Sequence, residues 1–118
     1  MKLYAVRVFV RDWESACDFY ENVLELPVKY KEPALGWAKF NIGGPSLGLE
    51  RVAVDDQDGA ELVGRFVGIS LQVDDIDAGY KKLSEKGVEF IEPPTKQDWG
   101  GTLAHFKDPA GNILTLLG

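Results

Sequence analysis

The chain has 118 residues, 45% of them hydrophobic and 27% charged, which is the size and balance of one globular domain. The net charge is −6 and no segment is rich in lysine and arginine, so we expect no nucleic-acid partner, because phosphate contacts supply most of the affinity in such complexes. No apolar run approaches the about 18 residues of a membrane helix and the N-terminus shows no signal-peptide cleavage site, so we expect no membrane partner and a cytoplasmic protein.

The N-terminal segment predicts a strand followed by a helix. Residues 5–10 alternate between apolar and other side chains, as one strand of a half-buried sheet does. Asp12 follows, and its carboxylate can accept amide hydrogens from the first turn of a helix. Cys17, the only cysteine, lies on the apolar face of that helix and is interpreted as a small buried hydrophobic residue. The rest of that face consists of Trp13, Ala16, Tyr20, Val23 and Leu24.

Short strands follow the first helix, and then the pattern starts again. The strands of the first half are expected near 27–31, 36–42 and 46–53. Residues 54–63 are largely polar, contain a glycine and form the natural linker. Beyond this linker, residues 68–87 again read as an alternating strand, an acidic residue and a helix.

The second half matches the first closely. Asp75 lies 63 positions after Asp12 and occupies the same N-cap place. Gly79 falls inside the second helix, where glycine costs up to about 1 kcal/mol against alanine. We explain this glycine by a close approach of the helix to its sheet. Three further strands are expected near 88–91, 101–107 and 112–117.

The repeat predicts an α+β fold in a single domain, 1–118. Two tandem modules, 1–53 and 64–118, each have the order strand, helix, strand, strand, strand and are joined by the linker 54–63. Together they form a curved, trough-like mixed sheet with the helices on its outer face, the modules being related by a pseudo-twofold axis. A small ligand would lie in the trough. Because two open-edged modules can pair within or between chains, we also expect a homodimer.

Two segments carry a family resemblance. VRDWESACDFYENVLELPV resembles the first-helix signature of the vicinal oxygen chelate superfamily, which holds glyoxalase I, the bleomycin-resistance proteins and extradiol dioxygenases. FKDPAGNILTLL resembles its closing hairpin, and with VDDIDAGYKKLSEKGVEF between them the likeness covers nearly the whole chain. Glu25 stands where the family usually has a glycine in a left-handed helix cap, so we expect an altered helix end or strain there.

The resemblance implies four positions for metal ligands, on the first and last strands of each repeat. In this sequence they correspond to Ala5, Glu50, Gly68 and Thr115. Only Glu50 carries a strong ligand, and one carboxylate does not make a zinc or calcium site. We therefore expect no metal, no other cofactor and no reaction by the metal-dependent route of the superfamily.

Strand alternation predicts which side chains line the trough. In the first strand, Tyr4, Val6, Val8 and Val10 are expected to face the helices. Trp99, in the loop KQDWGG, resembles the bleomycin-resistance branch, whose members bind a drug without chemistry. No catalytic residue is assigned. The expected ligand-binding residues are Arg7, Phe9, Trp37, Glu50, Phe66, Gln72, Trp99 and His105.

These features favour a protein that binds an aromatic or cationic small molecule in the trough without metal. The acidic surface would attract a cation through its long-range field, or it serves solubility alone. One alternative is an enzyme, either a glyoxalase-like lyase or isomerase or a metal-free enzyme that uses Glu50 or His105 as acid or base. Another is a structural module that pairs with a second chain. Glu50 itself either contacts the ligand or pairs with Arg7.

Overall fold

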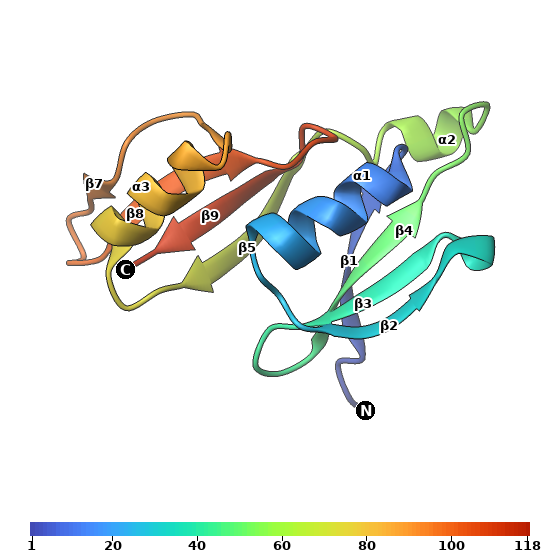
Figure 1. Ribbon diagram of the computed structural model, residues 1–118, viewed down its shortest axis with the longest axis horizontal. Coiled ribbons are helices and arrows are strands. Elements are labelled where there is room, and N and C mark those ends of the chain that lie inside the picture. The colour runs from blue at the N-terminus through green and yellow to red at the C-terminus, as the bar shows by residue number, and fades with distance from the viewer.

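The computed structural model describes residues 1–118 and contains two mixed β-sheets side by side (Figure 1). The first sheet has the order β1-β4-β3-β2 and the second the order β5-β9-β8-β6, with β7 paired to β8. β1 runs parallel to β4, β5 runs parallel to β9, and the other pairs are antiparallel. The first-sheet strands are β1 (Ala5–Val10), β2 (Val28–Glu32), β3 (Trp37–Asn41) and β4 (Ser46–Arg51). Those of the second sheet are β5 (Phe66–Gln72), β6 (Glu89–Phe90), β7 (Thr95–Lys96), β8 (Thr102–Lys107) and β9 (Ile113–Leu117).

Two principal helices lie on the same side of the sheets (Figure 1). α1 (Trp13–Asp18) continues as a π-helical turn, η1 (Phe19–Val23), and α3 (Ile76–Glu85) covers the second sheet. Two short elements were not predicted. They are a 3₁₀ turn, η2 (Pro33–Leu35), and a helix, α2 (Gln57–Ala60). None of the helices has both the length and the apolar composition needed to cross a bilayer. The α+β class is confirmed.

Both predicted helix caps are confirmed. Oδ1 of Asp12 accepts a hydrogen bond from the amide of Ser15, and Oδ1 of Asp75 accepts one from the amide of Ala78, each at 3.1 Å. The expected strain at the end of the first helix is also present. Glu25 has a φ of 59°, a left-handed conformation that disfavours side chains with a Cβ.

The core lies between the helices and the sheets and is continuous across both modules. Val8 and Val10 of β1 are fully buried, as the alternation predicted. Tyr4 does not follow them, and this expectation was wrong. Its side chain is 66% exposed and its hydroxyl accepts a hydrogen bond of 2.9 Å from Nζ of Lys39 on the opposite face. Tyr4 precedes β1, so the strand alternation does not fix its direction.

Gly79 does not mark a close approach of α3 to the sheet, and that expectation was also wrong. A Cβ at this position would lie 3.5 Å from Cδ2 of Leu116 and 3.6 Å from Cγ2 of Val73. Both are ordinary van der Waals distances, so a methyl group fits there. The packing therefore gives no reason for a glycine inside this helix.

Candidate functional site

The side of the first sheet opposite α1, called the first face, carries the first group of predicted site residues. Nη1 of Arg7 lies 3.1 Å from Oε1 of Glu50, and the guanidinium carbon lies 5.3 Å from the centroid of the Phe9 ring. Glu50 thus has its partner within the chain. Because the two side chains are 57% and 38% exposed, the pair contributes little to stability and its charges stay accessible.

Trp37 lies on the same face, and the position of its ring requires a glycine beneath it. A Cβ at Gly48 would collide with the ring of Trp37, so the indole lies over the backbone of β4. Gly48 is buried beneath this ring, whereas Trp37 remains half-buried. The glycine therefore allows a large aromatic side chain to lie across the strand with one side open.

Two tyrosines that were not among the predicted site residues also belong to the first face. Nζ of Lys39 lies 4.8 Å from the ring centroid of Tyr4 and 5.8 Å from that of Tyr30. Tyr30 is opposite Lys39 in the β2–β3 ladder, next to an irregularity between Val28 and Tyr30. That irregularity disturbs the alternation of the segment VKYKE, which is why the sequence pattern alone did not reveal Tyr30.

The helix-free side of the second sheet, called the second face, carries the other group. The rings of Phe66 and His105 meet edge to face with centroids 5.6 Å apart. Nδ1 of His105 and Oγ1 of Thr115 share a hydrogen bond of 2.9 Å whose direction depends on the histidine tautomer. Phe66 is 56% exposed, and Gln72, at the end of the same strand, is exposed too.

Trp99 repeats the arrangement of Trp37. A Cβ at Gly101 would collide with the Trp99 ring, so the indole lies over the chain just before β8. Gly101 is two residues before Leu103 and four before His105, so all three lie at alternate positions of one chain face. The ring is 67% exposed, which leaves its outer side free for a ligand.

The strand register corrects the position of one presumed metal ligand. Arg7 lies five residues before the cap Asp12 and pairs with Gly48, while Ser70 lies five residues before Asp75 and pairs with Thr115. Gly48, and not Glu50, is therefore the counterpart of Thr115. Gly48 lies 36 residues after Asp12 and Thr115 lies 40 residues after Asp75, so counting along the sequence does not align the two positions.

The residues at these four positions do not fit a metal ion. Ala5, Gly48 and Gly68 offer no side-chain donor, and the hydroxyl of Thr115 is bonded to His105. A zinc site needs three or four strong ligands. No group of three histidine, cysteine, aspartate or glutamate side chains lies close enough together to supply them.

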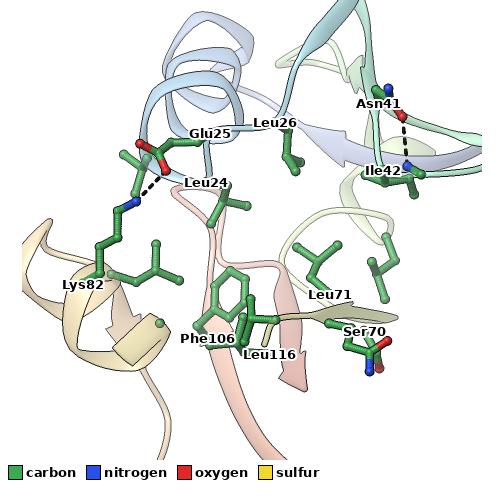
Figure 2. A pocket seen from close by; sticks show the side chains of 17 residues that line it. Leu24, Glu25, Leu26, Asn41, Ile42, Ser70, Leu71, Lys82, Phe106 and Leu116 are labelled. Carbon is green, nitrogen blue, oxygen red and sulfur yellow. Dashed lines mark hydrogen bonds and ion pairs between the residues drawn. The ribbon is translucent and has the colours of Figure 1, made fainter. Parts of the chain in front are cut away.

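The structure joins the predicted residues in two groups and not in one. Arg7, Phe9 and Glu50 are in contact on the first face, and Phe66 contacts His105 on the second. No hydrogen bond, ion pair or ring contact links the two groups. A cavity between the two modules, shown in Figure 2, includes Gln72 but none of the other predicted residues.

Comparison with known proteins agrees with this geometry. The Glyoxalase/Bleomycin resistance protein/Dioxygenase superfamily model matches residues 2–116. The crystal structure of a member of that superfamily from Sphaerobacter thermophilus superposes with a TM-score of 0.83 at 31% identity, covering 99% of this chain and 96% of that one.

Two relatives of named activity are similar over most of their length. A bleomycin resistance protein of Klebsiella pneumoniae is 29% identical, with 91% of this chain and 84% of that protein covered. The metallothiol transferase FosB of Shouchella clausii is 28% identical, with 89% and 71% covered. The matched model, the shared fold and the repeated strand-helix pattern agree, and the chain belongs to the Glyoxalase/Bleomycin resistance protein/Dioxygenase superfamily.

Proposed function

We propose that this protein binds an aromatic small molecule, without metal, in a trough between a first face and a second face. One observation carries the proposal. Trp37 lies over Gly48 of β4 and Trp99 lies over Gly101 just before β8, so each rests one side of its ring on the chain and leaves the other side open. Such rings lose little conformational freedom when a ligand stacks on them.

The charges of the first face favour an aromatic ligand that is neutral or anionic over one that carries a positive charge. Arg7 and Lys39 are positive and Glu50 is negative, so these three groups leave one positive charge in excess. Both cations already lie against aromatic rings of the protein. A cationic ligand would have to displace them, although the whole chain carries a net charge of −6.

We further propose that a second copy completes the trough. β1 and β5 are edge strands, and each has one side without a hydrogen-bonded neighbour. Leu3, Tyr4 and Phe66, which lie at or beside these edges, are 67%, 66% and 56% exposed. In the proposed homodimer the first face of one chain lies opposite the second face of its partner.

An enzyme remains the second candidate, because His105 is held by Thr115. A half-buried imidazole with one nitrogen in a hydrogen bond of 2.9 Å is oriented as a general acid or base must be. The relation to a metallothiol transferase makes a group transfer or lyase reaction the one to test. Conversion of any bound ligand by the wild type, lost in His105→Ala, would favour this candidate.

Calorimetric titration tests the binding proposal. The panel consists of 1-naphthol, 1-naphthoate and bleomycin, which are a neutral, an anionic and a cationic aromatic compound. Trp37→Ala and Trp99→Ala should each weaken binding by about two- to tenfold, as expected for the loss of one stacking contact. Leu35→Ala, which removes a side chain 71% exposed on η2, is the matched control and should have no effect. Unchanged affinity in both tryptophan variants would place the ligand elsewhere.

Mixing the two variants tests the dimer. In a heterodimer of Trp37→Ala and Trp99→Ala chains, one trough lacks both tryptophans and the other keeps both. Mixing should therefore restore full affinity at half of the sites in those heterodimers. A trough built within one chain would show no restoration, and a monomeric mass by light scattering at high micromolar concentration would contradict the dimer.

A further inference from the structure

A cavity lies on the helix side of β5, away from the contacts described on both faces, although Asn41, Ser70 and Gln72 also border it (Figure 2). Its volume is about 610 Å³, within the range of small-molecule sites. Leu24 and Leu26, which follow η1, form one wall, and Leu71 of β5 forms another. Phe106 and Leu116 of the second sheet form the floor, so both modules of one chain build this cavity.

Gly79 of α3 keeps one side of the cavity open. It lines the cavity, and a Cβ there would meet Leu116 and Val73 only at ordinary contact distances. A helix interior disfavours glycine, and the packing does not require one at this place. The missing side chain therefore has its main effect on the space inside the cavity.

A charged group stands at the rim. Oε2 of Glu25 lies 2.6 Å from Nζ of Lys82, and its Oε1 lies 3.6 Å from Nζ of Lys86. Glu25 and Lys82 both line the cavity (Figure 2). Two ammonium groups thus converge on one carboxylate, which leaves one positive charge in excess beside an apolar cavity. Glu25 holds this place in a left-handed conformation that glycine would adopt more easily.

We propose that this cavity is a binding site for an amphipathic organic anion. The apolar body of the ligand lies among the leucines and Phe106, and its anionic group pairs with Lys82, which it shares with Glu25. Charge complementarity selects an anion, and the apolar walls select a body without further polar groups. The site does not depend on the proposed trough, because it lies on the other side of β5 and uses neither tryptophan.

The probe for this site is cis-parinarate, a fluorescent amphipathic anion without an aromatic ring, with decanoate and decanol as competitors. We expect saturable binding of one probe per chain, displaced by decanoate at a concentration at least fivefold lower than decanol. Lys82→Gln should remove this preference for decanoate. Lys81→Gln, the neighbouring exposed lysine of α3, does not line the cavity and should leave the preference unchanged.

Filling the cavity is the second arm of the test. Gly79→Leu should weaken probe binding at least tenfold, and Gly79→Ala should weaken it less while α3 becomes more stable. Circular dichroism and thermal unfolding verify that Gly79→Leu is folded. If Gly79→Leu fails to fold, probe binding by Gly79→Ala and Lys82→Gln still tests the proposal. Probe binding unaltered by these substitutions would overturn the proposal.

Two further outcomes separate this proposal from the trough. Trp37→Ala and Trp99→Ala should leave probe binding intact, whatever they do to aromatic ligands. Probe binding that is lost in the tryptophan variants would move the probe to the trough and overturn the cavity site. Binding that vanishes as the protein concentration rises would show that a second copy covers the cavity, and this also overturns the proposal.

Discussion

The hydroxyl of Tyr20 donates a hydrogen bond of 2.9 Å to Oδ2 of Asp108 and so links the π-helical turn of the first module to the β8–β9 turn of the second. Oδ1 of Asp108 accepts the amides of Ala110 and Asn112, each at 2.9 Å. The side chain of Asn112 in turn donates to the carbonyl of Phe9 at 2.9 Å. The turn DPAGN therefore has two roles, because it closes a hairpin and joins the modules.

Tyr20→Phe should lower the free energy of unfolding by about 1.5–3 kcal/mol, since it removes a buried hydrogen bond to a charged group. Urea denaturation measures the change. Tyr4→Phe is the matched control, because its hydroxyl is also bonded but the side chain is 66% exposed, and it should change stability by less than about 0.5 kcal/mol. Equal effects of the two substitutions would contradict a stabilising role of the hydrogen bond from Tyr20 to Asp108 between the modules.

The same residue should make the fold sensitive to alkali. Burial, the charge of Asp108 and the hydrogen bond to it raise the pKa of Tyr20 well above its usual value of 10. Above pH 10 the unfolded chain loses this proton while the folded chain keeps it, so the free energy of unfolding must fall as the pH rises. The stability difference between wild type and Tyr20→Phe should shrink above pH 10, in urea titrations at several pH values. A difference independent of pH would refute this.

Cys17 should react slowly. Burial raises the pKa of its thiol to about 11, and the side chain is 1% exposed. At pH 8 only about one thiol in a thousand is then ionised, and the reagent must also reach it through the core. Labelling with a chromogenic disulfide at pH 8 should be at least about a hundredfold slower in the native protein than in urea. Labelling at the rate of the denatured chain would show that α1 does not protect Cys17.

Substitutions at Glu25 should separate backbone strain from charge. Glu25→Gly relieves the left-handed strain and removes the bonds to Lys82 and Lys86, whereas Glu25→Ala removes the bonds and keeps the strain. Glu25→Gly should therefore melt at a higher temperature than Glu25→Ala at every salt concentration. At 1 M salt it should also melt above the wild type, because salt screens the exposed ion pairs. The reverse order in thermal unfolding would be inconsistent with strain at this residue.

Gly48→Ala should displace the ring of Trp37. The added methyl group collides with the indole, and such overpacking costs about 1–3 kcal/mol. Urea denaturation and tryptophan fluorescence measure the loss of stability and the movement of the ring. Gly44→Ala is the control, since a Cβ there meets nothing within 4 Å. A variant as stable as the control with an unchanged spectrum would mean that Trp37 does not lie over Gly48 in solution.

Titration with nickel, zinc or manganese should give no tight site in the trough. Ala5, Gly48 and Gly68 supply no donor and Thr115 supplies one hydroxyl. Calorimetry should show no stoichiometric heat at micromolar protein. Heat that saturates at one metal per chain, and that disappears in Thr115→Ala or Glu50→Ala, would overturn this prediction.

The sequence was most informative where local chemistry fixes structure. Asp12 and Asp75 cap their helices because a short carboxylate next to an apolar helical pattern has one favourable conformation. Val8 and Val10 are buried because alternation along a strand gives each side chain a side of the sheet. Neither inference needs any knowledge of distant segments.

The sequence was least informative where contacts between distant segments determine the structure. The pairing of Gly48 with Arg7 depends on turn lengths and on strand register, which no local pattern encodes. The ring position of Trp37 depends on Gly48, which lies on another strand. The pairing of Arg7 with Glu50 was named from the sequence as one alternative, but the rings of Tyr4 and Tyr30 around Lys39 were not.

The glycines at 48 and 68 also restrict how this chain can evolve. Gly68 has a φ of 70° at a place where β5 shifts its register against β9, so any other residue there is strained. Gly48 lies beneath the Trp37 ring, so any other residue there must first displace an aromatic side chain. A metal site with at least three of the four ligands would need a new side chain at one or both of these glycines, and each such substitution lowers stability before any metal can bind. The two glycines thus raise the stability cost of building a metal site in this chain by single substitutions.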